Sequence, residues 1–130
     1  MQRLILILCG VAVMGFATAN AKTGPLQGEH LRTTISGKTV HLQTGMGIEV
    51  PISYSDNGTM AAKTQAMTAA LAGESRPHDR GKWWIADSRL CQRWQNWLEG
   101  KTYCFVLSLE GKTVYWRSNN GRSGTARISH

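Results

Sequence analysis

Four side chains in one tryptophan-rich block, residues 81–98, have the types and spacing of a binding surface. Trp84 and Trp97 provide aromatic faces on which a sugar ring can stack, while Lys82 and Arg93 can form charge-assisted hydrogen bonds with phosphate or carboxylate groups. The block holds four of the five tryptophans in the chain. We therefore predict that these four side chains bind an anionic headgroup or a sugar.

The tryptophans also have a purely structural interpretation, which stays open. In small β domains tryptophan commonly packs in the core or covers a disulfide. If Ile85 and Leu90 share the core face, the alternation of a strand turns Trp83 and Trp94 inward and their neighbours outward. Trp97 falls at a predicted hairpin tip, where contact with a partner would best explain it.

Residues that commonly perform catalysis or bind metals show no suitable pattern. Ser123 stands one residue short of the nucleophile-elbow spacing and follows a predicted turn. Asp79 and Asp87 lie roughly 26 Å apart along a straight strand at about 3.3 Å per residue, too far for a glycosidase pair. We predict no metal, no cofactor and no catalytic residues; an enzyme with its site at a barrel mouth is the alternative. The histidines are dispersed along the chain, without metal-ligand spacing: His30, His41, His78 and His130.

The first 21 residues have the three parts of a secretory signal peptide, which are a charged start, an apolar run and a small-residue exit. The apolar run, residues 4–16, has 13 residues, fewer than the roughly 20 that cross a bilayer as a helix. We predict cleavage before Lys22 and a periplasmic or secreted product without a membrane span. Residues 22–130 are expected to form a single domain.

The three cysteines divide into one that leaves with the leader and two that remain. Cys9 lies inside the apolar run; a lipoprotein acylated there is an alternative, although Leu8 stands where a small residue is expected. Cys91 and Cys104 form an even pair in an oxidising compartment, so we predict a disulfide. In the chain-entropy model, closing a ring of about 14 residues contributes roughly 3 kcal/mol.

The chain is basic, with 15 Lys and Arg against 8 Asp and Glu. Removing the leader takes away Arg3, which leaves 14 against 8 and a net charge of +6. Such a charge attracts anionic partners over a distance that salt shortens. We expect an anionic envelope glycan or lipid as the partner and, because of the compartment, no nucleic acid; a role in solubility alone is the alternative.

The elements that must position these residues are mainly strands. A short helix is predicted over residues 26–36, with Gly37 as its stop. From residue 38 the apolar period is two, and glycine-containing turns separate the segments. Eight strands are predicted, near residues 38–44, 48–54, 59–64, 80–86, 89–95, 101–109, 112–118 and 122–128.

Turn lengths predict which residues lie opposite each other, because a slip of one residue would send apolar side chains to the wrong face. A tight turn at residues 110–111 is predicted to pair Leu107 with Val114. A bridge between neighbouring strands would place Cys91 directly opposite Cys104, on the face away from the core. Three-residue loops predict the further pairs Leu42 with Val50, Val40 with Ile52, Tyr54 with Met60, Ile52 with Ala62 and Trp116 with Gly124.

The strand pattern predicts a mainly β fold, an eight-stranded antiparallel meander that closes into a small, lipocalin-like barrel after one short helix. Such a barrel is either filled by side chains or holds one small ligand. A β-sandwich is the alternative. The stretch 61–77 breaks the alternation and is predicted to be a long excursion containing a helical turn, serving as a binding lid or lacking order.

Four segments carry a resemblance to a known family: GKWWI at 81–85, LCQRW at 90–94, YC at 103–104 and GRSGTA at 121–126. Over roughly residues 26–128 the chain resembles a family of small exported proteobacterial domains of unknown function. The resemblance implies a secreted or periplasmic single domain that retains its cysteine pair. It implies no established activity or catalytic residue.

These observations predict an exported, non-catalytic envelope protein that binds an anionic glycan, lipid or other envelope component. The alternative is a periplasmic inhibitor or accessory protein that binds another protein. A net charge of +6 would repel a basic target such as a lysozyme, and the chain has no acidic cluster to offset that repulsion.

Overall fold

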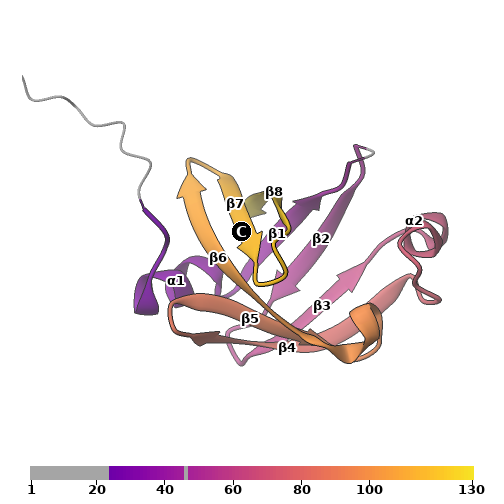
Figure 1. Ribbon diagram of the computed structural model, residues 1–130, viewed down its shortest axis with the longest axis horizontal. Helices are drawn as coiled ribbons and strands as arrows, with labels where there is room; N and C mark the ends of the chain where they lie inside the picture. The colour runs from indigo at the N-terminus through magenta and orange to yellow at the C-terminus, as the bar shows by residue number, and fades with distance from the viewer. Residues whose placement is uncertain (1–23, 46) are drawn as a thin grey trace, which may run out of the picture.

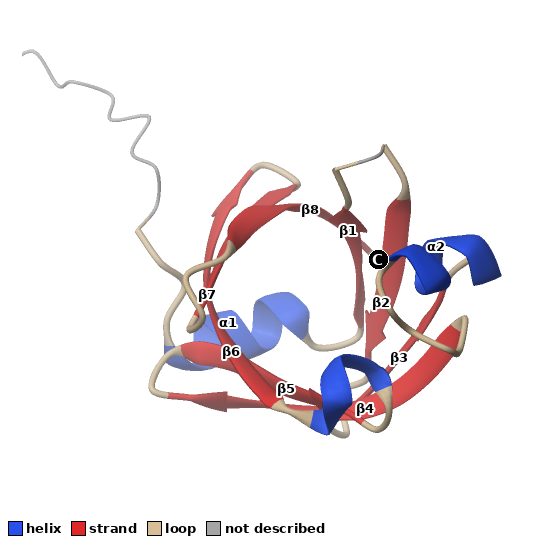
Figure 2. Ribbon diagram, turned by 45° about the vertical axis from the view of Figure 1, so that its right-hand side comes forward, coloured by secondary structure: helices blue, strands red, loops and turns tan. Residues whose placement is uncertain are grey.

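Eight antiparallel strands close into a barrel, each hydrogen-bonded to the next, with β8 pairing back to β1 (Figures 1 and 2). This confirms the predicted meander and its closure, and the sandwich alternative is wrong. The strands are β1 Lys38–Gln43, β2 Glu49–Tyr54, β3 Thr59–Lys63, β4 His78–Ala86, β5 Arg89–Trp94, β6 Thr102–Glu110, β7 Thr113–Ser118 and β8 Ser123–Ser129.

The computed structural model describes residues 24–45 and 47–130. The predicted signal peptide, with Cys9, lies outside the described residues. Among the residues that are described, no helix is long and apolar enough to cross a membrane.

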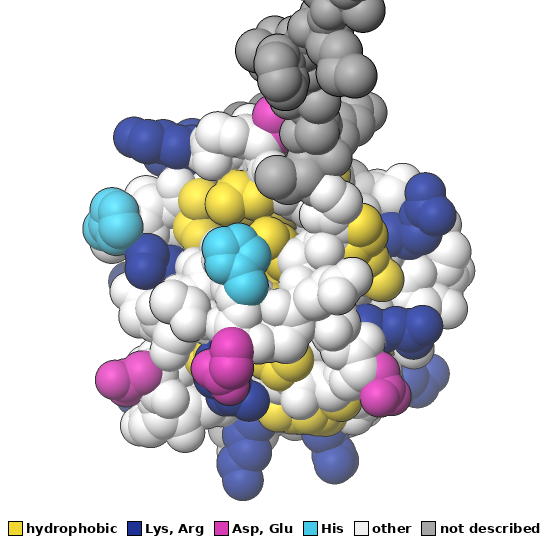
Figure 3. Space-filling view, turned by 90° about the vertical axis from the view of Figure 1, so that its left-hand side faces the viewer, with side chains coloured by type: hydrophobic (Ala, Val, Ile, Leu, Met, Phe, Trp, Pro, Cys, Tyr) yellow, Lys and Arg dark blue, Asp and Glu magenta, His cyan; other side chains and the backbone are white. Residues whose placement is uncertain are grey.

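Helix α1, Gly28–Ile35, crosses one end of the ring of strands (Figure 2). Leu31 and Ile35 are fully buried there, as expected for residues four apart on one helical face. Gly37 follows with a φ of +73°, a left-handed conformation that glycine adopts without strain. Seen from the α1 side, hydrophobic side chains lie among polar ones, and Lys and Arg side chains project around the edge (Figure 3).

The opposite end of the barrel carries the two other helical segments (Figure 1). Helix α2, Ala66–Leu71, forms within the predicted excursion between β3 and β4. The short turn η1, Trp97–Gly100, joins β5 to β6. The excursion therefore contains the predicted helical turn.

Strand pairing follows the predicted register at most positions. The five pairs expected from three-residue loops are present. The turn between β6 and β7 differs: Glu110 pairs with Thr113, so Leu107 lies opposite Trp116 and not Val114. Gly111, with a φ of +60°, occupies the first loop position of a tight hairpin, which requires a left-handed residue there. The shift is two residues, so every side chain keeps its predicted face.

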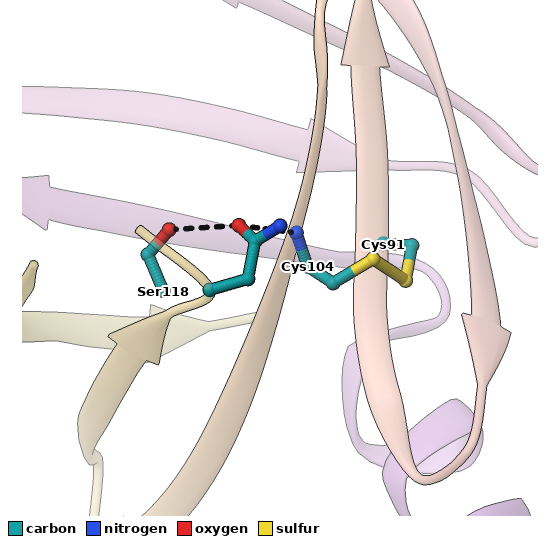
Figure 4. Close-up of a disulfide and its surroundings, with 4 residues drawn as sticks. Cys91, Cys104 and Ser118 are labelled. Atoms are coloured by element: carbon teal, nitrogen blue, oxygen red, sulfur yellow. Dashed lines mark hydrogen bonds between the residues drawn. A yellow bond between two sulfur atoms is a disulfide. The ribbon is translucent and has the colours of Figure 1, made fainter. Parts of the chain in front are cut away.

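Cys91 and Cys104 form the predicted disulfide between the facing strands β5 and β6, with their Cα atoms 4.0 Å apart (Figure 4). Trp84 on β4 is the register partner of Cys91, and Cys91 is only 2% exposed. On the other side, the Asn119 side chain accepts a hydrogen bond from the Cys104 backbone N–H at 3.4 Å. It also lies 3.3 Å from the hydroxyl oxygen of Ser118. The disulfide thus belongs to a continuous outer row that runs from β4 to the β7–β8 loop.

Beside α1, core side chains fill the side of the barrel formed by β3 and β4. Trp83 is buried, and its ring meets that of Tyr54 edge to face, with 5.9 Å between the ring centroids. The indole N–H of Trp83 donates to the carbonyl of Ser55 at 2.8 Å. Met60 and Leu31 fill the space around this pair as part of the same core cluster.

Candidate functional site

A cavity of about 340 Å³ lies inside the barrel and extends from Ile35 of α1 to the connections at the α2 end. This volume lies in the lower part of the range for small-molecule sites, about 300–1,000 Å³. Inward positions of six strands contribute to its wall, as the alternation of β-strands dictates; β3 and β4 contribute none. The wall is mostly aliphatic and aromatic, including Val40, Ile52, Leu90, Phe105, Leu107 and Trp116.

The inner end of the cavity combines apolar groups with one polar pair. Ile35 of α1 lines the cavity at this end. The hydroxyl of Tyr54 donates to Oε1 of Gln92 at 2.8 Å, and both side chains are buried. Burial raises the pKa of Tyr54 well above its usual range, so its hydroxyl stays protonated. Because the Tyr54 hydroxyl and the Gln92 amide oxygen hydrogen-bond to each other, a ligand need not supply a polar atom at this end of the cavity.

All four connections at the α2 end contribute to the mouth of the cavity. Thr44 comes from the β1–β2 loop, Thr68 and Ala72 from the excursion, and Leu98 from η1. The β7–β8 loop supplies Asn120 and Arg122. Among the lining residues, Arg122 is the only Lys or Arg. Arg122 is exposed, and it forms no ion pair with a described carboxylate. The mouth therefore places one unpaired cation, Arg122, at the edge of an apolar cavity; Glu74, whose carboxylate accepts a hydrogen bond from the N–H of Leu98, is the acidic residue of the lining.

A network of hydrogen bonds fixes the η1 side of the mouth. Asp79 is buried, and its carboxylate accepts hydrogen bonds from the backbone N–H groups of Asn96, at 2.8 Å, and Trp97, at 2.7 Å. Burial alone would raise the pKa of Asp79, but these hydrogen bonds outweigh it and the pKa lies below the usual value. Glu74 accepts a hydrogen bond from the N–H of Leu98 at 2.8 Å, which ties the excursion to η1.

Three of the four predicted binding residues share one outer surface, as the sequence indicated. Lys82 and Arg93 are exposed register partners on β4 and β5, and Trp84 is 37% exposed beside them. Lys63 and Arg80 extend the same surface across β3 and β4. We call these five residues the cationic face. The single carboxylate on the three strands is Asp79, which is buried and engaged with η1.

Trp97 lies in the connection between β5 and β6, as predicted, but its side chain is buried and does not join the cationic face, so the expectation that it contacts a partner there is wrong. It is 8% exposed, packs on Trp94 with 4.9 Å between ring centroids, and lines the cavity. Its indole N–H donates to the carbonyl of Arg76 at 2.9 Å. Asp79 holds the backbone of this turn against the barrel and so brings the indole inward. No local sequence pattern reveals that contact, because the β4–β5 hairpin separates Asp79 from the turn along the chain.

The cavity itself also escaped the sequence analysis. Its lining residues were expected on the inner face, but alternation does not distinguish a filled barrel from a hollow one. One signal was present: β8 turns Ala126 inward, where a larger residue would fill the space, and Gly124 leaves room for the Trp116 indole. Arg122 belongs to the GRSGTA segment, and nothing in that local pattern indicates that its side chain reaches the mouth of a cavity.

The described residues contain no cluster of three or more His, Cys, Asp or Glu that could hold a metal ion. Ser123 is exposed at the start of β8. His41 lies 2.8 Å from the hydroxyl of Ser129 and 3.5 Å from the Glu49 carboxylate, on the outside of the barrel. The features that stand out chemically are therefore the apolar cavity with Arg122 at its mouth and the cationic face.

No protein-family model, curated protein or solved structure gives a significant match to this chain. The resemblance noted from the sequence stays a prediction.

Proposed function

We propose that this protein is an exported, non-catalytic binding protein of the cell envelope. Its ligand is an anionic amphipathic lipid. The apolar part of the ligand occupies the barrel cavity, and its anionic group stays at the mouth beside Arg122. The observation that carries the proposal is the apolar cavity of about 340 Å³ with a single, unpaired cation at its opening.

The lining of the cavity supports this orientation of the ligand. Transfer of an acyl chain from water to an apolar wall is favourable by about 25 cal/mol per Å² of buried surface. The Tyr54 and Gln92 side chains satisfy each other, so the inner end suits the terminal methyl group of a chain. An anionic headgroup buried there would lose its hydration without a charged partner. At the mouth it keeps water and gains Arg122.

The disulfide and the net charge support the location and the sign of the ligand. A disulfide between Cys91 and Cys104 persists in oxidising compartments such as the periplasm. A basic protein attracts anionic components of an envelope in preference to neutral ones.

Binding experiments with fatty acids of increasing length test the proposal. Octanoate, dodecanoate and palmitate would be titrated against a fluorescent fatty acid bound to the delipidated protein, with native mass spectrometry to count bound molecules. We expect one molecule per protein and an optimum at the shorter chains, because the cavity is small. Failure of all three to displace the probe or to bind would overturn the proposal.

Two matched pairs of variants locate the ligand. Ala72 lines the mouth and Ala70 on α2 does not, although both are exposed. We expect Ala72→Phe to block the cavity and Ala70→Phe to leave affinity unchanged. Arg122→Gln should weaken binding of the carboxylate by roughly tenfold, in line with one lost charge-assisted hydrogen bond. Arg117→Gln, on the outside of β7, is its control.

The cationic face supports a second candidate function, binding of an anionic glycan. Lys82 and Arg93 lie side by side with an exposed tryptophan on β4, and none of the three strands turns a carboxylate outward. Charge-assisted hydrogen bonds and ring stacking would then hold the glycan. Trp84→Ala combined with Arg93→Ala should abolish retention on peptidoglycan and lipopolysaccharide at low salt; unchanged retention would exclude this function.

A further inference from the structure

The mouth of the barrel exposes apolar side chains that the fold itself does not use. Helix α2 turns Thr68 and Ala69 toward the barrel, where they are buried. Met67 and Leu71 lie four residues apart, on one face of the helix, and are 74% and 65% exposed. On the neighbouring turn η1, Leu98 is 42% exposed while it also lines the cavity. We call Met67, Leu71 and Leu98 the apolar rim.

The backbone of η1 holds Leu98 outward at an energetic cost. Leu98 and Glu99 have φ values of 54° and 58°, a left-handed conformation that is unfavourable for residues with side chains. The Glu74 carboxylate accepts the N–H of Leu98, and Glu99 forms an ion pair with Lys101 at 2.9 Å. Strain of this kind persists where surrounding contacts enforce it, and it concentrates at functional positions.

Positive charge surrounds the apolar rim. Lys63 ends the strand that leads into α2, and Arg76 lies in the segment that returns from it. Arg93 donates through Nε to the carbonyl of Gly100 at 2.8 Å, which places its guanidinium against η1. None of these three side chains forms an ion pair with a described carboxylate. The two carboxylates of the rim region, Glu74 and Glu99, are engaged locally.

We propose that the apolar rim docks onto an anionic lipid bilayer. Met67, Leu71 and Leu98 enter the headgroup region, and Lys63, Arg76 and Arg93 contact lipid phosphates. Apolar insertion together with basic residues is the combination that binds peripheral proteins to anionic membranes. The cavity mouth then faces the bilayer, so an amphipathic ligand can pass from the bilayer into the cavity without crossing water. This role in ligand transfer rests on the proposed function.

A bilayer fits the rim better than a protein partner does. A standard protein interface takes about 20–30 residues from each side. Three apolar side chains around an open cavity mouth make no such surface. A bilayer needs no complementary shape and accepts them singly.

Flotation with vesicles tests the docking. The full mature protein would be mixed with vesicles of phosphatidylcholine, with or without phosphatidylglycerol. We expect binding to the anionic vesicles that weakens as salt rises. Met67→Ser with Leu71→Ser should lower the partition coefficient by roughly tenfold or more, because two inserted side chains are lost. Tyr115→Ser, an exposed side chain on the outside of β7, should leave it unchanged.

A charge pair of variants completes the design. Lys63→Gln with Arg76→Gln should lower binding to anionic vesicles by roughly thirtyfold, since each cation near an anionic surface contributes roughly fivefold, whereas Lys112→Gln at the other end of the barrel should not. Equal binding by the rim variant and the wild type would overturn the proposal. So would light scattering that shows a wild-type dimer dissociating in the rim variant, since a second copy then covers the rim.

Ligand titration in solution, without vesicles, separates the two proposals. A rim variant that loses vesicle binding but keeps the affinity for dodecanoate supports both. A wild-type protein that binds vesicles but no fatty acid keeps the docking and removes the proposed function.

Discussion

The Tyr54 hydroxyl donates a 2.8 Å hydrogen bond to Oε1 of Gln92, joining β2 to β5 across the inside of the barrel. The two strands are not neighbours, since β3 and β4 separate them along the sheet. One bond therefore satisfies two buried polar groups and links opposite parts of the wall.

Removing the Tyr54 hydroxyl should destabilise the protein by more than the value of one hydrogen bond. Tyr54→Phe leaves Oε1 of Gln92 buried without its donor, at a cost of about 1–3 kcal/mol in the free energy of unfolding. Adding Gln92→Leu should recover most of that loss, because no orphaned polar group remains. Urea unfolding of the two single variants and the double variant measures the coupling. Additive losses would show that the bond does not matter.

Asp79 should make the protein sensitive to acid. Its pKa is lower in the folded protein than in the unfolded chain, so its stabilisation is complete above about pH 4 and is lost as pH falls toward the folded-state pKa. Asp79→Asn should lower stability at pH 7 by about 1.5–3 kcal/mol and flatten the acid part of the curve. Urea midpoints between pH 2 and 7 would be compared with those of Asp87→Asn, at the exposed β4–β5 turn. Parallel curves for wild type and Asp79→Asn would contradict the assignment.

Gly124 should set the width of the cavity. A Cβ atom at this position would lie 2.7 Å from Cζ2 of Trp116, so the indole must move. We expect Gly124→Ala to shift the tryptophan emission spectrum and to weaken fatty-acid binding. Gly45→Ala, where a Cβ meets nothing within 4 Å, provides the control. Unchanged emission and affinity in Gly124→Ala would show that the Trp116 indole can move without altering the cavity.

Loss of the disulfide should weaken the barrel without changing its register. Cys91→Ala with Cys104→Ala removes a link whose chain-entropy contribution is about 3 kcal/mol. The midpoint of urea unfolding should fall accordingly, while the β-sheet circular dichroism spectrum is kept, because eight strand pairings still define the fold. Mass spectrometry of native material should find no free thiol at either position. Two free thiols there would remove the basis of this prediction.

Local patterns in the sequence were enough to predict the strands, the closure and most of the register. Alternation and turn length are properties of neighbouring residues, and the disulfide gave a constraint between β5 and β6 that agreed with them. The β6–β7 turn was misplaced by one residue because Gly111 can occupy either loop position. Only the hydrogen-bonded ladder decides between them.

The sequence by itself determined which side chains face inward, which cations face outward and which cysteines pair, since these follow from the period of a strand. The tertiary structure alone decided that the barrel encloses a cavity, that Trp97 lines that cavity and that Arg122 stands at its mouth. Those features depend on volumes and contacts summed over eight strands and on a carboxylate, Asp79, that reaches a distant turn. A local sequence pattern contains no information about these volumes and long-range contacts.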